Sequence, residues 1–432
     1  MSKNTIIYFT TVPFSRRDYE RYGIEWWVNA GFSVTVLDVG YFAQPAREPE
    51  WDNAMYRNES FDLAVLRQKS ELKRYRGMLA DASLIVDLTT AHGHSRWNLS
   101  ILRAISKSKT PYILLSVNAY PGYDLPLDQS RDLAGKIQVF LARLKAADPL
   151  NSIIARIPCR WLGIRPATAV VYGGRRSRRQ ITTVTPNTLE IFGHHMDYDI
   201  FLDQDSEVSL ENTAVFIDQD LGGHREFVSN KAFHQMDTEQ YYRLLRKTLE
   251  RVGKITGLEI VIAKHPHALS ADPERFLPNW RIVQGRTLEL VRNCKLVIAH
   301  NSAAIASVVL NRKPLLLVFS KDYIDSSHWN PVSHYPLAEA LERNCLYLED
   351  IAETDDDEFL ADLTAGFDRY IEDYISVGPL HREKLWPIIG RALYEHKIIG
   401  GNSIPAGQSS AKRKSVGETQ YRLGAESAGN LR

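Results

Sequence analysis

The feature that most restricts the fold of this chain is an alternation of short, β-rich apolar runs with stretches of helical periodicity. In the first half, these runs lie at 5–11, 32–39, 84–90, 112–118 and 167–172. The rhythm restarts in the second half, with runs at 213–217, 258–263, 281–283, 296–299 and 315–319. Strand-length apolar runs separated by helices are typical of α/β layers around a mostly parallel sheet.

Two successive α/β blocks of similar size, in a chain of 432 residues, predict two Rossmann-like domains that face each other across a cleft. A polar stretch without strand character, 203–207, marks the boundary between them. The predicted domains are therefore 1–205 and 206–400. Residues 401–432 are rich in Gly, Ser, Ala and charged residues and show no apolar period, so we predict a disordered C-terminal tail there.

Composition and charge exclude several classes of protein. Apolar residues make up 44% of the chain, which argues against extensive disorder, and 53 basic against 52 acidic residues give no overall charge that would attract nucleic acid. Three scattered cysteines without a CxxC pair argue for a reducing compartment and against structural zinc. No signal peptide or bilayer-spanning run is apparent. We expect a cytoplasmic protein, and basic clusters such as 175–179 leave open a peripheral contact with the inner membrane.

Polar and ionisable side chains follow the predicted strands of the second half. Asp218 and Asp220 follow the first of these strands, Lys264 and His265 follow the second, and His300 follows a later one. Ligands of open α/β sheets bind beyond the carboxyl ends of the strands. We therefore expect these side chains to gather at one edge of the sheet, which core packing alone does not require.

Several of these positions suit a phosphate group. Helix N-termini bind anions through free backbone N–H groups, and a nearby hydroxyl or cation adds a further contact. The predicted phosphate-binding residues are Lys264, His265, Arg286, Thr287, His300, Asn301 and Ser302. Ordinary helix capping by Asn301 or Ser302 is the structural alternative. His265 and His267 could bind a metal ion instead, but a third ligand at matching spacing is not apparent, so we predict no metal site.

The segment Asp218-Gln219-Asp220 has three interpretations. The two carboxylates could hold a divalent cation on a nucleotide diphosphate, one of them could act as the general base that deprotonates an acceptor hydroxyl, or they could cap a loop. In the first half, His92 and His94 follow the run at 84–90. They are candidates for the acceptor side of the same cleft, or else loop histidines with a structural role.

Taken together, these motifs resemble a known family. An acidic motif after the first strand of the second domain, a His-Pro turn at His265, and Ser302 at the head of a helix that leads to Lys313-Pro314 resemble GT-B glycosyltransferases of bacterial surface polysaccharides, above all the sialyl-, polysialyl- and Kdo-type transferases. The resemblance implies that Asp218 or Asp220 is the general base and that His265 and Ser302 bind the nucleotide phosphate. The stretch 259–314 also looks like the donor-binding half of the wider GT-B and UDP-N-acetylglucosamine 2-epimerase group.

The expected function follows from that resemblance. It implies an inverting, metal-independent glycosyltransferase without a cofactor, which moves a sugar from a CMP- or UDP-linked donor to a glycan or glycolipid acceptor of a capsule, O-antigen or lipopolysaccharide core. Two alternatives stay open: a UDP-sugar 2-epimerase-like enzyme of the same architecture, and a non-catalytic module that binds a nucleotide or a glycan. Nucleic acid is not an expected partner.

Overall fold

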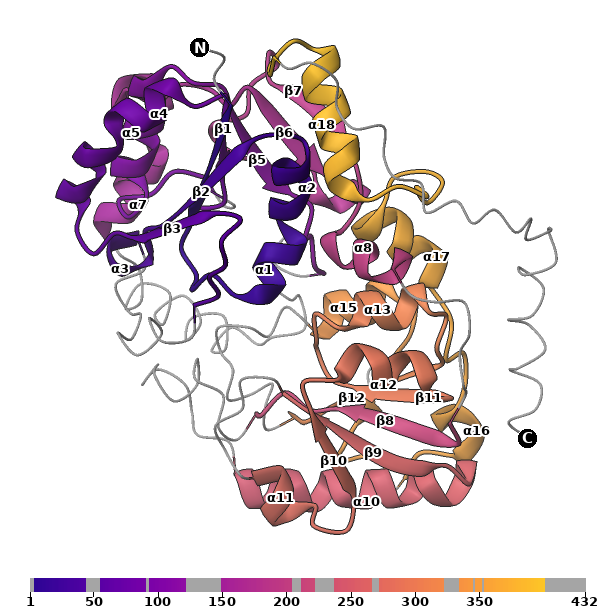
Figure 1. Ribbon diagram of the computed structural model, residues 1–432. Coiled ribbons are helices and arrows are strands. Elements are labelled where there is room, and N and C mark those ends of the chain that lie inside the picture. The colour runs from indigo at the N-terminus through magenta and orange to yellow at the C-terminus, as the bar shows by residue number, and fades with distance from the viewer. Residues whose placement is uncertain are drawn as a thin grey trace. The chain divides into compact units, whose positions relative to one another are not determined.

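The computed structural model describes residues 4–43, 55–90, 93–121, 149–203, 211–221, 237–265, 272–321, 334–344, 346–351 and 353–400. They form two compact units, each built on its own sheet (Figure 1). The first unit contains the described residues up to Ala119, those from 149 to Leu202, and those from Glu372 onward, while the second is formed mainly by the chain from Asp203 to Ile371. The predicted tail, 401–432, lies outside the described residues.

The sheet of the first unit has seven strands in the order β3-β2-β1-β4-β5-β6-β7, and every neighbouring pair is parallel. The strands are β1 (Thr5–Thr10), β2 (Ser33–Asp38), β3 (Asp62–Val65), β4 (Leu84–Asp87), β5 (Tyr112–Ser116), β6 (Ala169–Tyr172) and β7 (Leu189–Phe192). Their central members are buried along almost their whole length, because helices cover both faces of a parallel sheet.

The helices of the first unit are mostly short. They are α1 (Arg16–Arg21), α2 (Ile24–Asn29), α3 (Gly40–Ala43), α4 (Arg76–Asp81), α5 (Leu99–Ser108), α7 (Pro149–Arg156), α8 (Met196–Leu202) and α18 (Leu385–Glu395). Helices α1 and α2 meet at Gly23, whose φ is 60°. A Cβ atom at Gly23 would stand 2.2 Å from the Trp386 ring, so both the backbone and the close packing require glycine there.

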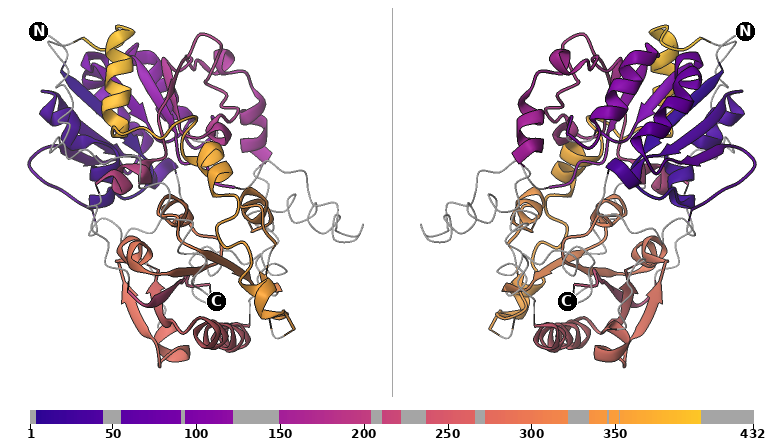
Figure 2. Two further views of the ribbon diagram at one scale, coloured as in Figure 1. Left: turned by 90° about the vertical axis from the view of Figure 1, so that its right-hand side faces the viewer. Right: turned by 90° about the vertical axis from the view of Figure 1, so that its left-hand side faces the viewer.

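Helix α18 belongs to the first unit, which corrects the predicted domain border at 206–400. Its apolar side chains Leu385, Trp386 and Ile389 share one buried cluster with Ile6 and Tyr8 of β1. Both views in Figure 2 show this helix, in yellow, beside the sheet of the first unit. The chain therefore returns to the first unit after completing the second, because the apolar face of α18 covers strands made at the very start of the sequence.

The sheet of the second unit has six strands in the order β10-β9-β8-β11-β12-β13, again all parallel. These are β8 (Thr213–Ile217), β9 (Glu259–Lys264), β10 (Arg281–Gln284), β11 (Leu296–Ala299), β12 (Leu315–Phe319) and β13 (Leu346–Tyr347). Parallel sheets in both units confirm the predicted α/β class with two such domains.

The helices of the second unit are α10 (Thr238–Thr256), α11 (Asp272–Phe276), α12 (Thr287–Asn293), α13 (Ile305–Leu310), α15 (His334–Ala340), α16 (Asp356–Phe359) and α17 (Phe367–Tyr370). Helix α10 begins and ends as its sequence predicts. The Asp237 side chain accepts a hydrogen bond from the Gln240 amide (3.0 Å), and Gly257 ends the helix with a φ of 66°. In the described part of the chain, no helix combines the length and the apolar character needed to cross a bilayer.

Candidate functional site

Three of the predicted site residues stand in one row at the carboxyl edge of the second sheet. Ile217 of β8 pairs with Ala263 of β9 and with Ala299 of β11, so the next residues along each strand, Asp218, Lys264 and His300, lie side by side. The residues two positions earlier, Phe216, Ile262 and Ile298, belong to the core under α10. Because side chains alternate between the faces of a strand, the polar row also faces the layer of α10 and α11.

Asp218 supplies the carboxyl group of this row, and its surroundings change its pKa. Its amide donates to the Ala263 carbonyl (3.0 Å), which fixes the residue as a continuation of β8, and the residue is only 2% exposed. One carboxylate oxygen, Oδ1, accepts the Asp220 amide (3.2 Å), whereas Oδ2 is buried and has no hydrogen-bond partner among the described residues. Burial raises the pKa of Asp218 to about 6, although nearby backbone amides, led by that of Asp220, lower it.

Asp220 and Tyr242 extend this buried polar cluster. Asp220 has a φ of 54°, in the left-handed region, and its Oδ1 is buried with no hydrogen-bond partner in the part of the chain that the structure describes. The hydroxyl of Tyr242 is likewise buried and unpartnered, and burial followed by the nearby charge of Asp218 raises its pKa well above the usual range. Three unsatisfied polar atoms in one neighbourhood are costly, and such groups are characteristic of functional sites. Among the described residues, no three His, Cys, Asp or Glu side chains form a metal-binding cluster.

His300 does not offer a ring nitrogen to a phosphate, which corrects its predicted role. The Val318 carbonyl can only accept a hydrogen bond, so Nδ1 of His300 carries the hydrogen and donates to it. Nε2 then accepts a hydrogen bond from the Tyr241 hydroxyl (2.7 Å). The imidazole is 1% exposed, and burial lowers its pKa to about 4, so it is neutral near pH 7. His300 therefore joins α10 to two strand ends.

Adjacent tyrosines on α10 give opposite expectations for stability. Tyr241→Phe removes the donor to His300 and leaves a buried acceptor unpaired, so we expect a loss of about 1–3 kcal/mol in the free energy of unfolding. Tyr242→Phe removes a hydroxyl that has no partner, so we expect no loss or a small gain. Urea titrations of both variants measure the difference, and equal destabilisation would contradict the hydrogen-bond assignment.

Lys264 and His265 continue β9 but differ in their surroundings. The Lys264 ammonium group contacts both carboxylate oxygens of Glu274, at 2.8 and 3.0 Å, and the residue is 8% exposed. Its charge is thus neutralised by α11. His265 is half-buried, and its backbone carbonyl accepts a hydrogen bond from Gln284 (3.1 Å). Of these two predicted phosphate ligands, His265 is the more exposed residue.

The remaining predicted ligands lie on the turns that follow β10 and β11. Arg286 precedes α12 and is exposed, and its guanidinium Nε donates to Glu289 (2.7 Å), while Thr287 is half-buried at the first position of α12. Asn301 and Ser302 are half-buried before α13. This helix begins at Ile305, whereas the sequence predicted Ser302 at its head. The Ser302 hydroxyl accepts a hydrogen bond from the Ala304 amide (3.2 Å), and a hydroxyl that accepts can also donate its own hydrogen.

Of the two histidines predicted for the acceptor side, the structure describes His94. His92 lies outside the described residues. His94, in the first unit, is 4% exposed, and its Nε2 donates to the Ile154 carbonyl (2.8 Å) while Nδ1 accepts from the Thr182 hydroxyl (2.7 Å). Because both ring nitrogens are satisfied by the protein, His94 is a structural histidine, which corrects its predicted role in acceptor binding.

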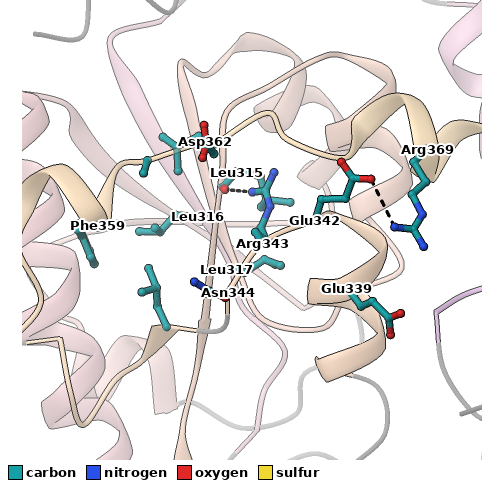
Figure 3. Close-up of a pocket in the computed structure, with 13 residues that line it drawn as sticks. Leu315, Leu316, Leu317, Glu339, Glu342, Arg343, Asn344, Phe359, Asp362 and Arg369 are labelled. Atoms are coloured by element: carbon teal, nitrogen blue, oxygen red, sulfur yellow. Dashed lines mark hydrogen bonds and ion pairs between the residues drawn. The ribbon is translucent and has the colours of Figure 1, made fainter.

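A cavity of about 440 Å³ lies in the second unit, but at the opposite end of the sheet (Figure 3). It begins at Leu315, the first residue of β12, and Arg343 occupies its centre. The Arg343 guanidinium donates to the carbonyls of Leu315 and Ala365, and Glu342 pairs with Arg369 (3.4 Å). The two arginines of this cavity are therefore engaged by the protein itself, and none of the predicted site residues lines it.

Comparisons with known proteins found similarity to this chain only among solved structures. No protein-family model and no curated protein sequence matches it. The wall teichoic acid polymerase TagF is similar at 11% identity, over 92% of this chain and 90% of that one, with a TM-score of 0.49. A putative UDP-N-acetylglucosamine 2-epimerase from Listeria monocytogenes (10% identity, 92% and 97% coverage, TM-score 0.49) and the calicheamicin glycosyltransferase CalG4 (10%, 92% and 100%, 0.47) are similar too. At these values the likeness assigns no activity to this chain.

Proposed function

We propose that the protein is an inverting glycosyltransferase that uses a nucleotide-activated sugar, with Asp218 as the general base. The observation that carries this proposal is the Asp218 carboxylate itself. It is held at the end of the central strand, is buried, and retains one oxygen that no described residue hydrogen-bonds. An acceptor glycan of a bacterial capsule, O-antigen or lipopolysaccharide core, as the sequence motifs imply, completes the proposed reaction.

The chemistry of an inverting transfer matches such a carboxylate. The acceptor hydroxyl attacks the anomeric carbon while the bond to the nucleoside phosphate breaks, so the hydroxyl proton must leave as the new C–O bond forms. A base with a pKa of about 6 is ionised near neutral pH and is still basic enough to take that proton. The Oδ2 atom of Asp218, which has no hydrogen-bond partner, is the proposed proton acceptor.

The leaving phosphate is proposed to bind at the turns after β9, β10 and β11. His265, Thr287, Asn301 and Ser302 are half-buried there, and each can donate a hydrogen bond from a side chain. Lys264 and Arg286 already form ion pairs with Glu274 and Glu289. In this proposal they do not contact the phosphate, but contribute to the net charge at the carboxyl edge of the second sheet. Donors of this kind stabilise developing negative charge without a bound cation.

Calorimetry with UDP and with CMP tests the phosphate assignment. We expect His265→Ala and Ser302→Ala each to weaken nucleotide binding by about 1–3 kcal/mol, because each removes a hydrogen bond to a charged group. His396→Ala, an exposed histidine of the first unit, is the matched control and should leave the affinity unchanged. Unchanged affinity in the first two variants would remove these residues from the phosphate site.

A panel of CMP- and UDP-sugars with glycan acceptors, in the presence of EDTA, tests the activity. We expect release of nucleotide that depends on an acceptor and persists in EDTA. Formation of an epimerised UDP-sugar without acceptor would instead support the 2-epimerase alternative, and nucleotide binding without turnover of any donor would support a binding module. Recovery of activity only after addition of magnesium or manganese would reassign Asp218 and Asp220 to a cation.

A further inference from the structure

The most exposed large apolar side chains of the described residues lie close together in the first unit. Leu150 is 52% exposed, Ile153 59% and Trp161 71%, whereas the other exposed large apolar residues are scattered and lie between 40 and 44%. Single exposed apolar residues are normal on a protein surface, but a cluster of them marks an interaction site.

These residues belong to one surface, which we call the α5–α7 face: helix α5, helix α7 and the 3₁₀ turn Cys159–Leu162. Ile154 and Ile157 pack against the small buried cluster that contains Leu102 of α5. The Arg103 guanidinium of α5 donates to the Leu162 carbonyl (2.7 Å), which ties α5 to the turn. Figure 1 shows α5 and α7 on the same side of the first sheet.

Helix α7 presents its exposed residues as a stripe. Leu150, Ile153 and Arg156 recur every three residues and so lie on one side of the helix. Arg160 and Trp161 follow in the 3₁₀ turn, where the Arg160 guanidinium lies 5.9 Å from the Trp161 ring centre. Apolar and cationic side chains are therefore interleaved along this segment.

The α5–α7 face is also strongly basic. Residues 99–108 and 149–162 together contain four Lys and Arg and no Asp or Glu. Arg103, Lys107, Arg156 and Arg160 are exposed and form no ion pair with other described residues. The four cations of this face thus have no acidic partner in the described part of the chain, although the net charge of the whole chain is only +1.

The arginine cluster at 175–179, which the sequence singled out for a membrane contact, is different. Arg175 pairs with Asp373 (2.8 Å) and Arg178 with Glu190 (2.8 Å). Arg176 also lies 3.8 Å from Asp373. These arginines are thus balanced by acidic side chains of the first unit, and that surface offers less free charge than the α5–α7 face.

We propose that the α5–α7 face docks on an anionic lipid surface. The arginines and lysines meet the headgroups, where each adds about a factor of five to the affinity. Leu150 and Ile153 gain by leaving water for the acyl boundary, and Trp161 takes the interfacial position that tryptophan prefers. A soluble polyanion would bind the cations but would give the aliphatic side chains no apolar medium. An anionic lipid surface therefore accounts for both the basic and the apolar side chains of the face.

Co-sedimentation of the full chain with vesicles tests this proposal. We expect binding to phosphatidylcholine vesicles that contain phosphatidylglycerol, and none to phosphatidylcholine alone. Arg156→Gln/Arg160→Gln should lower the affinity about 30-fold, and Ile153→Ser/Trp161→Ser should also lower it. The matched controls, Lys247→Gln/Lys254→Gln on α10 and Phe192→Ser/Tyr394→Ser, alter exposed residues elsewhere and should bind as the wild type does.

Three results would overturn the proposal. The first is absence of binding to the phosphatidylglycerol vesicles, and the second is equal affinity of the arginine variant and its lysine control. The third is binding to heparin or single-stranded nucleic acid that both arginine substitutions weaken, without any binding to vesicles, which would assign the face to a soluble polyanion.

Discussion

Asp218→Asn is expected to lower turnover by about 10²–10⁴-fold while nucleotide affinity stays unchanged. The amide keeps the shape of the carboxylate and can still accept the Asp220 amide, but it cannot take up a proton. In the wild type, turnover should rise with pH through about 6, where Asp218 loses its proton, and then level off. Steady-state rates between pH 5 and 8 (about two units around that pKa), with calorimetry of nucleotide binding, measure both effects.

Asp220→Asn is the internal control for this result. Asparagine tolerates the left-handed backbone that Asp220 adopts, so the substitution should change turnover much less. A dead Asp220→Asn beside an active Asp218→Asn would transfer the role of base to Asp220. If both variants remained active, neither carboxylate would be the base.

Asp218→Asn, which is expected to lower turnover, should increase the stability of the fold. Burial raises the pKa of Asp218 to about 6 in the folded chain, above the ordinary value of an aspartate, so ionisation of Asp218 destabilises the fold as the pH rises toward and through 6. Asp218→Asn removes that cost and should raise the free energy of unfolding at pH 8 by about 2–3 kcal/mol. The gain should vanish below about pH 4, where both states are protonated. Urea titrations at the two pH values check this, and a variant that is inactive and also less stable would indicate a structural role.

Trp386→Ala is expected to destabilise the first unit by about 3–5 kcal/mol. The Trp386 ring lies 5.9 Å from the rings of both Tyr8 and Trp27, and its Nε1 donates to the Arg21 carbonyl (2.8 Å). The loss combines a large cavity with a lost hydrogen bond. Hydrogen exchange followed by mass spectrometry should show faster exchange in peptides from β1 and α2, with β8 and β9 unchanged.

Tyr394→Ala, on the same helix, is the matched control. Tyr394 is 44% exposed, so its removal should change stability by no more than about 0.5 kcal/mol. If Trp386→Ala instead loosened β8 and β9 and left β1 protected, α18 would not be part of the first core.

Strands buried on both faces could be predicted from the sequence, because such strands must be apolar at successive positions. Leu84–Asp87 and Leu315–Phe319 are of this kind, and every residue in them is buried. The edge strands Asp62–Val65 and Leu189–Phe192 were missed, since half of their surroundings is solvent and neither has more than three successive apolar residues. The close packing at Gly23, between α1 and α2, could not be predicted either, because its partner, Trp386, lies far along the chain.

The candidate site could be located from the sequence, but the state of its side chains could not. Asp218, Lys264 and His300 lie at one edge because the parallel strands β8, β9 and β11 end at the same level. The position of each residue at the end of an apolar run is enough to predict this. Whether each side chain can contact a ligand depends on its partners from other helices and strands. Glu274 neutralises Lys264 and Tyr241 engages His300, and no spacing in the sequence links these pairs.

The place of Leu385–Glu395 in the first core also sets an order of events during protein synthesis. The second unit is mainly one uninterrupted stretch of chain, so its sheet can form while the last helix is still inside the ribosome. The first unit, although it is made earlier, must wait for that helix before Tyr8 and Trp27 are covered. A nascent chain that stalls before residue 385 therefore carries a folded second unit beside an apolar face that chaperones and proteases can recognise.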